Sequence, residues 1–95
     1  MDNFNQKILK KFENAYDLVV NNSNKLKKLP NNVSLDDIQQ LYDWTNQHYL
    51  DDAKTNNDMK DLFWGYADSL FNDQYDEDQI DDLANAAFDI FKKCK

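Results

Sequence analysis

One glycine, Gly65, and one proline, Pro30, occur in a chain of 95 residues. A β-sheet needs several tight turns, and glycine is the residue that these turns most often require. Four stretches of the chain instead repeat apolar residues with the helical period of about 3.6 residues. The sequence therefore predicts an all-α fold rather than a sheet.

The apolar spacing predicts helices at about 3–21, 35–52, 56–72 and 77–93. Each of them has one apolar face and one polar face, and the connections after the second and third helices are short. Amphipathic helices joined in this way pack as antiparallel neighbours around a shared core. We expect a single helical domain over 1–95, formed by a compact antiparallel bundle of four helices.

Three of the predicted helices begin at a residue that can cap them, namely Ser34, Thr55 and Asp76. Each is followed three residues later by an acid or a glutamine. A side-chain oxygen at this position accepts a hydrogen bond from a free backbone N–H of the first turn. Two of these starts are also flanked by apolar pairs that fit hydrophobic staples, Val33 with Ile38 and Tyr75 with Ile80.

The charge of the chain is strongly asymmetric. It has 18 acids and 11 lysines, which gives a formal net charge of −7. Residues 1–32 carry six lysines and three acids, whereas 33–95 carry five lysines and fifteen acids. From Asp61 to Asp89 there are nine acids and no base. Direct binding to nucleic-acid phosphates is not expected at this charge, and a basic protein surface is the expected partner.

Targeting signals are not evident in the sequence. No segment approaches the ~20 apolar residues of a membrane span. The first residues lack the apolar core and small-residue cleavage site of a signal peptide. The single cysteine, Cys94, fits a reducing compartment. We expect a cytoplasmic protein, in the host cytoplasm if a phage encodes it.

Residue patterns for catalysis and for cofactors are missing. The one histidine, His48, and the one cysteine, Cys94, stand in no catalytic motif, and they are too few for a zinc site. One glycine cannot build a phosphate-binding loop. A calcium loop that starts at Asp73 has alanine, Ala84, where glutamate is required. We expect no enzyme activity, no metal and no cofactor.

Some of the acids have a structural explanation, because carboxylates in first helical turns interact favourably with the helix dipole and others keep a surface soluble. Asp68, Asp73 and Asp82 stand outside first turns and have no lysine four residues away. Trp44 and Trp64 fall off the apolar stripes of their helices, where tryptophan can act as an interface anchor. The candidate partner-binding residues are Asp61, Trp64, Asp68, Asp73, Asp76, Glu77, Asp78, Asp82 and Trp44.

In size and acidity the chain resembles phage-encoded counter-defence proteins, such as anti-CRISPR proteins and other mimics of DNA. That resemblance lies in composition and not in a motif. It implies an inhibitor or decoy that occupies a basic surface of a nucleic-acid-handling protein. One alternative is a bacteriocin-type immunity protein, which a small four-helix bundle also resembles. Another is an adaptor or assembly subunit, and the sequence leaves a homodimer open.

Overall fold

The structure is a computed structural model, and it describes residues 3–26, 28–52 and 58–94. Four α-helices make up most of these residues. No strand occurs in these ranges, and the predicted all-α bundle is confirmed. Two short helical segments, η1 and η2, follow the first helix. The elements are α1 (Asn3–Tyr16), the π-helical η1 (Asp17–Asn21), the 3₁₀-helical η2 (Ser23–Lys25), α2 (Leu35–Asp52), α3 (Met59–Phe71) and α4 (Glu77–Lys93).

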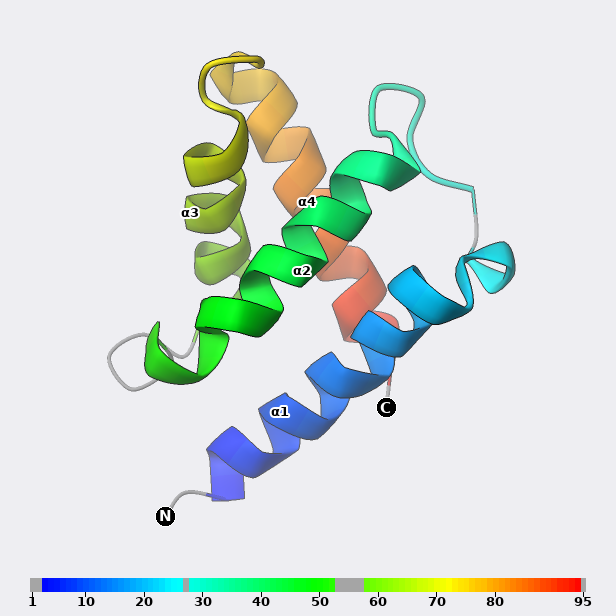
Figure 1. The fold of residues 1–95 in the computed structure, drawn as a ribbon, viewed down its shortest axis with the longest axis vertical. Coiled ribbons are helices and arrows are strands. Elements are labelled where there is room, and N and C mark those ends of the chain that lie inside the picture. Colours follow the sequence, from blue (N-terminus) through cyan, green and yellow to red (C-terminus); the bar gives the residue numbers. More distant parts are fainter. Residues whose placement is uncertain (1–2, 27, 53–57, 95) are drawn as a thin grey trace.

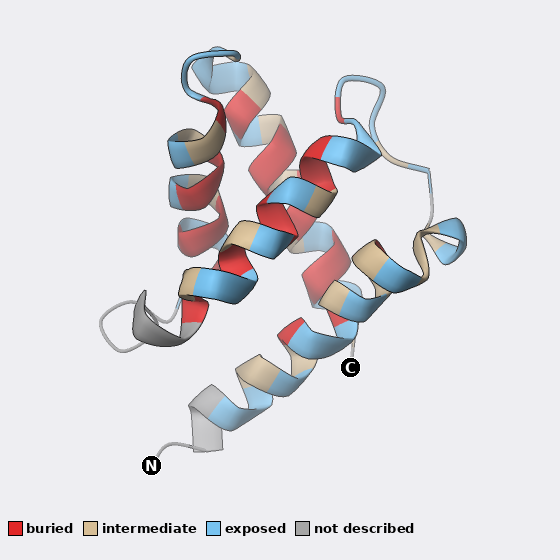
Figure 2. Cartoon of the chain, in the orientation of Figure 1, coloured by how far each residue is buried: buried red, intermediate tan, exposed pale blue. Residues whose placement is uncertain are grey.

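The helices alternate in direction along the chain. In Figure 1, α1 and α2 run in opposite directions, and α2 passes in front of α4. A tight turn at the top of the view joins α3 to α4, and these two helices share the most extensive interface. The buried residues of the helices face one another in Figure 2 and form one hydrophobic cluster. The radius of gyration is 12.6 Å, close to the ~12 Å expected for a folded chain of this length.

The centre of the core is a series of aromatic contacts to which each α-helix contributes one ring. Phe12 of α1 stacks on Tyr42 of α2, with ring centroids 5.5 Å apart. Tyr42 contacts Phe63 of α3 at 5.2 Å. Phe63 meets the edge of Phe91 of α4 at 6.3 Å. Each ring is at most 4% exposed, and full burial of such a ring contributes about 1.5–3 kcal/mol. These contacts hold the four helices together.

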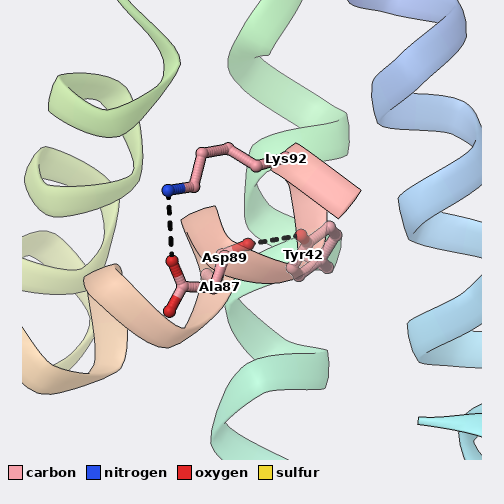
Figure 3. Close-up of polar contacts among 4 residues, drawn as sticks. All are labelled: Tyr42, Ala87, Asp89 and Lys92. Atoms are coloured by element: carbon pink, nitrogen blue, oxygen red, sulfur yellow. Dashed lines mark hydrogen bonds and ion pairs between the residues drawn. The ribbon is translucent and has the colours of Figure 1, made fainter. Parts of the chain in front are cut away.

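Tyr42 also makes the polar contact at the centre of this core. Its hydroxyl donates a hydrogen bond of 2.7 Å to the backbone carbonyl of Ala87 in α4, as Figure 3 shows. A phenol can be fully buried at low cost only when its O–H has such an acceptor. Burial raises the pKa of Tyr42, because the tyrosinate would lose its hydration.

Two of the predicted caps are confirmed and the third start differs. The Ser34 hydroxyl accepts from the backbone N–H of Asp37 at 3.1 Å. The Asp76 carboxylate accepts from the N–H of Gln79 at 2.9 Å. The third helix was expected to begin near 56 with Thr55 as its cap, but α3 begins at Met59 and Asp58 caps it. Thr55 itself lies outside the described residues.

The first predicted helix does extend to residue 21, but its last five residues are π-helical. The N–H of Asn22 donates to the carbonyl of Asp17, five residues back, at 3.0 Å. A π turn weakens the regular ladder of hydrogen bonds to the carbonyl four residues back. The amide of Gln39 in α2 donates to the carbonyl of Val19 within this turn, at 3.1 Å. This hydrogen bond gives the carbonyl of Val19 a donor from a neighbouring helix and connects η1 to α2.

Candidate binding surface

Four of the candidate residues lie together at the α3–α4 turn: Asp73, Asp76, Glu77 and Asp78. We refer to these four residues as the acidic turn. All four are exposed and fall within six positions of the chain. The backbone beneath them is held by hydrogen bonds, since the N–H groups of Gln74 and Tyr75 both donate to the carbonyl of Phe71 at 2.9 Å. The acidic turn therefore presents its carboxylates from a fixed backbone.

Tyr75 anchors the acidic turn to the rest of the molecule. Its ring packs against Phe71 with a centroid distance of 5.5 Å. Its hydroxyl donates a hydrogen bond of 2.7 Å to the carboxylate of Asp37, at the start of α2. The hydrogen bond to this carboxylate raises the pKa of Tyr75, and partial burial adds to the effect. Asp37 is itself only 9% exposed, so its carboxylate serves this contact rather than the surface.

The outer edge of α3 carries three further candidates, Asp61, Trp64 and Asp68. At about 100° per residue they lie within about 60° of one another around the helix axis. Asp61 is exposed, whereas Trp64 and Asp68 are half-buried. Trp64 packs against the core and lines a hollow of about 200 Å³. Its other lining residues are Asp58, Lys60 and Asp61 and, from α4, Ala84 and Asn85. The indole therefore sits at the seam between α3 and α4, beside a carboxylate.

Asp82 contacts the segment before α2 and does not belong to the outer edge of α3. It is half-buried on α4, and its carboxylate accepts a hydrogen bond from the amide of Asn32. The amide of Gln79, three residues earlier, donates to the backbone carbonyl of Asn32. Asp82 and Gln79 thus hold the segment that precedes α2 against α4. This structural contact accounts for Asp82 without a partner protein.

Trp44 lies at the seam between α2 and α3, away from the hollow of Trp64. Its ring is 4.5 Å from that of His48, and His48 in turn lies 6.3 Å from Tyr66 of α3. Tyr66 and Trp64 are two residues apart in α3 and therefore point to different sides of it. The two tryptophans are half-buried on different flanks of α3, so they do not form a single aromatic patch.

An ion pair partly neutralises the far end of the acidic stretch. Lys92 lies 3.6 Å from Asp89 (Figure 3), with side chains 55% and 60% exposed. A pair this exposed contributes little to stability because water and salt screen it. The described chain from Asp61 to Phe91 contains no lysine. The acidic turn therefore has no basic neighbour close to it in sequence.

The one histidine and the one cysteine of the sequence both pack against other side chains. His48 lies between the rings of Trp44 and Tyr66. Cys94 is half-buried against the core, and burial raises the pKa of its thiol, which disfavours the reactive thiolate. Within the described ranges, no three or more His, Cys, Asp or Glu side chains are grouped so that they could hold a metal ion.

Two residues with clear roles were not singled out as a pair from the sequence. In the sequence, Asp37 lies in the first turn of the helix predicted at 35–52 and Tyr75 belongs to a staple, yet the two side chains bond across 38 positions. The sequence carries no local signal for such a contact.

Among the helices that the structure describes, none is long and apolar enough to cross a membrane. No protein-family model matches the chain, and no curated protein or solved structure matches it either.

Proposed function

We propose that the protein is a non-enzymatic inhibitor that binds a basic surface of a nucleic-acid-handling protein and occupies it as a decoy. The observation that carries this proposal is the acidic turn, in which four exposed carboxylates project from a hydrogen-bonded backbone. The proposed surface extends from the acidic turn along the α3 edge to Asp68 and Asp61. Trp64 is its proposed apolar anchor.

Aspartate suits this role for a physical reason. Its side chain has few rotatable bonds, so each carboxylate stays close to the backbone position that carries it. Fixed charges lose less conformational entropy on binding than flexible ones do, which leaves more of the electrostatic attraction as affinity. The net charge of −7 would also steer the protein toward a cationic partner and speed association.

The proposal is tested by neutralising the acidic turn without removing its cap. The variant Asp73→Asn/Glu77→Gln/Asp78→Asn removes three exposed charges and keeps Asp76, which caps α4. A matched control, Glu13→Gln/Asp36→Asn/Asp43→Asn, removes three exposed charges from α1 and α2. Circular dichroism first establishes that both variants are folded.

Each immobilised protein is then exposed to a bacterial lysate, and bound proteins are eluted with duplex DNA. We expect wild type and the control to capture a DNA-displaceable protein at about 50 mM salt and to release it at about 500 mM. The acidic-turn variant should lose at least about tenfold in affinity for that protein once it is purified. Equal binding by both variants, or capture that DNA does not displace, would contradict the proposal.

The two alternatives predict different determinants. An immunity protein would depend on the C-terminal end of α4, with Lys92 and Lys93, and would act on a membrane receptor complex. An adaptor or a homodimer would need an apolar contact surface. Among the described residues, Leu35 is the one large hydrophobic residue that is exposed, at 36%. This favours the electrostatic proposal over an adaptor or a homodimer.

A further inference from the structure

An apolar groove lined by lysines lies apart from the acidic turn, between η1 and η2 on one side and α4 on the other. Its volume is about 490 Å³, within the range of small-molecule sites. Apolar side chains from both sides line it: Leu18 of η1, Leu26, Leu29 and Pro30 from the segment after η2, and Ala86 and Ile90 of α4. We call it the lysine-rimmed groove, because Lys25, Lys28 and Lys93 also line it.

The local backbone explains why the groove is left open. After η2 the chain becomes extended at Leu26, with φ −69° and ψ 143°. Packed helices fill the space between them by placing ridges of side chains into grooves, which an extended segment beside a helix does not do. On α4 the wall includes Ala86, whose methyl group fills little space. The neighbouring π-helical turn supplies Leu18, and π turns are frequent at functional sites.

The charges around the groove contrast with the rest of the protein. Three lysines, Lys25, Lys28 and Lys93, share its lining with one acidic residue, Asp89. Asp89 is paired with Lys92 at 3.6 Å, which reduces its repulsion of an anion. The groove is thus a cationic site on a chain of net charge −7. An apolar floor with a cationic rim is complementary to a ligand that is apolar along its length and anionic at one end.

We propose that the lysine-rimmed groove binds a free medium-chain fatty acid in its ionised form. The hydrocarbon chain would cover Leu18, Leu26 and Ile90, and the carboxylate would lie among the three lysines. Burial of the chain supplies the affinity, and the ammonium groups orient the ligand and select its charge. This site is separate from the acidic turn and does not depend on the function proposed for it.

The test uses laurate below its micelle concentration, with isothermal titration calorimetry on the full chain. We expect saturable binding of one laurate per protein. The affinity should fall about fourfold for each methylene removed, as decanoate and octanoate replace laurate. Dodecanol and dodecylamine have the same chain without the negative charge, and both should bind at least about tenfold more weakly than laurate.

Two variants separate the groove from general attraction. Lys25→Gln/Lys28→Gln/Lys93→Gln should lower the laurate affinity by about tenfold or more, because the anion loses its partners. The control Lys7→Gln/Lys10→Gln/Lys60→Gln removes three other exposed lysines and should bind as wild type does. All six lysines are exposed, so both variants are expected to fold. Circular dichroism verifies this.

Several results would overturn the proposal. Equal binding of laurate and dodecanol would show that the lysines do not recognise the anion. Binding that begins only above the micelle concentration would show detergent adsorption, and co-sedimentation with anionic lipid vesicles without binding of free laurate would show a membrane site. Salt-sensitive self-association that the groove variant abolishes, again without laurate binding, would show that a second copy's acidic surface occupies the groove.

Discussion

Tyr42 joins the aromatic core to the backbone of α4, and its protonation state is coupled to folding. Burial raises the pKa of Tyr42 above its ordinary value of 10.0, so the folded state retains the proton when the unfolded state has lost it. The stability that Tyr42 contributes is therefore complete below pH 10 and declines as the pH rises above that value. Each pH unit above 10 costs about 1.4 kcal/mol for such a group.

Tyr42→Phe should therefore change the alkaline behaviour of the protein. Near pH 8 we expect the variant to be about 1 kcal/mol less stable than wild type, because the bond to Ala87 is lost. Above pH 10 the deficit should shrink and then reverse, since phenylalanine has no proton to lose. Urea unfolding at a series of pH values measures both effects. A deficit that is constant with pH would contradict the role assigned to the buried phenol.

The bond between Asp37 and Tyr75 should contribute more than a chemically identical bond at the surface. Tyr16 donates to Asp43 at the same distance of 2.7 Å, but this pair is exposed. A double-mutant cycle with Asp37→Ala and Tyr75→Phe should give a coupling energy of about 1–2 kcal/mol. The cycle with Tyr16→Phe and Asp43→Ala should give less, because water competes there. Equal coupling energies would show that burial of Asp37 has no effect.

Whether the role of a residue could be predicted depends on how many positions along the chain separate it from its partner. Ser34 and Asp76 were predicted as caps because a cap bonds to a backbone group only three positions away, so the sequence contains both partners. The apolar residues of the core were predictable because helical spacing places them on one face. Asp37 and Tyr75 could not be paired, since their contact depends on how α2 packs against the α3–α4 turn.

At the scale of elements, the helices were predictable and one boundary was not. Thr55 and Asp58 can each cap a helix, and the spacing of apolar residues alone does not choose between them. The structure assigns the cap to Asp58, which accepts from the N–H of Lys60 at 3.1 Å. The change from α-helix to π-helix after Tyr16 was likewise not predictable, because Gln39 from another helix contacts that turn.

The candidate surface was likewise predictable only where its residues are close together in the sequence. The acidic turn was predictable because its carboxylates are neighbours in sequence and the connection between the helices is short. The positions of Trp44 and Asp82 relative to it depend on packing between elements, and Asp82 proved to bond with Asn32, 50 positions away. A sequence pattern can therefore indicate a charged surface, but it does not separate its binding residues from its structural ones.

Substitution of the turn acids should separate these two roles. Asp76→Ala should lower the free energy of unfolding by about 1 kcal/mol, because the N–H of Gln79 loses its acceptor. Asp76→Asn should be nearly neutral, since asparagine caps equally well without the charge. Asp73→Ala, at an exposed position without a cap, should stay within about 0.5 kcal/mol of wild type. Urea unfolding of the three variants checks this order, and a large loss for Asp73→Ala would contradict it.

At the scale of the whole molecule, the charge distribution should make stability depend on salt. Like charges crowded at the acidic turn repel one another in the folded state more than in the expanded unfolded chain. Sodium chloride screens this repulsion, since the screening length falls from about 30 Å at 10 mM to about 3 Å at 1 M salt. We therefore expect the free energy of unfolding to increase by about 1 kcal/mol over this range, which raises the melting temperature by about 4–8 °C.

The variants that test binding also locate the source of this salt dependence. Asp73→Asn/Glu77→Gln/Asp78→Asn should gain less stability than wild type does on addition of salt, because the crowded charges are gone. Glu13→Gln/Asp36→Asn/Asp43→Asn removes as many charges from α1 and α2 and should keep most of the wild-type response. Calorimetry of the three proteins at both salt concentrations measures the difference. If both variants respond alike, the repulsion depends on net charge and not on the acidic turn.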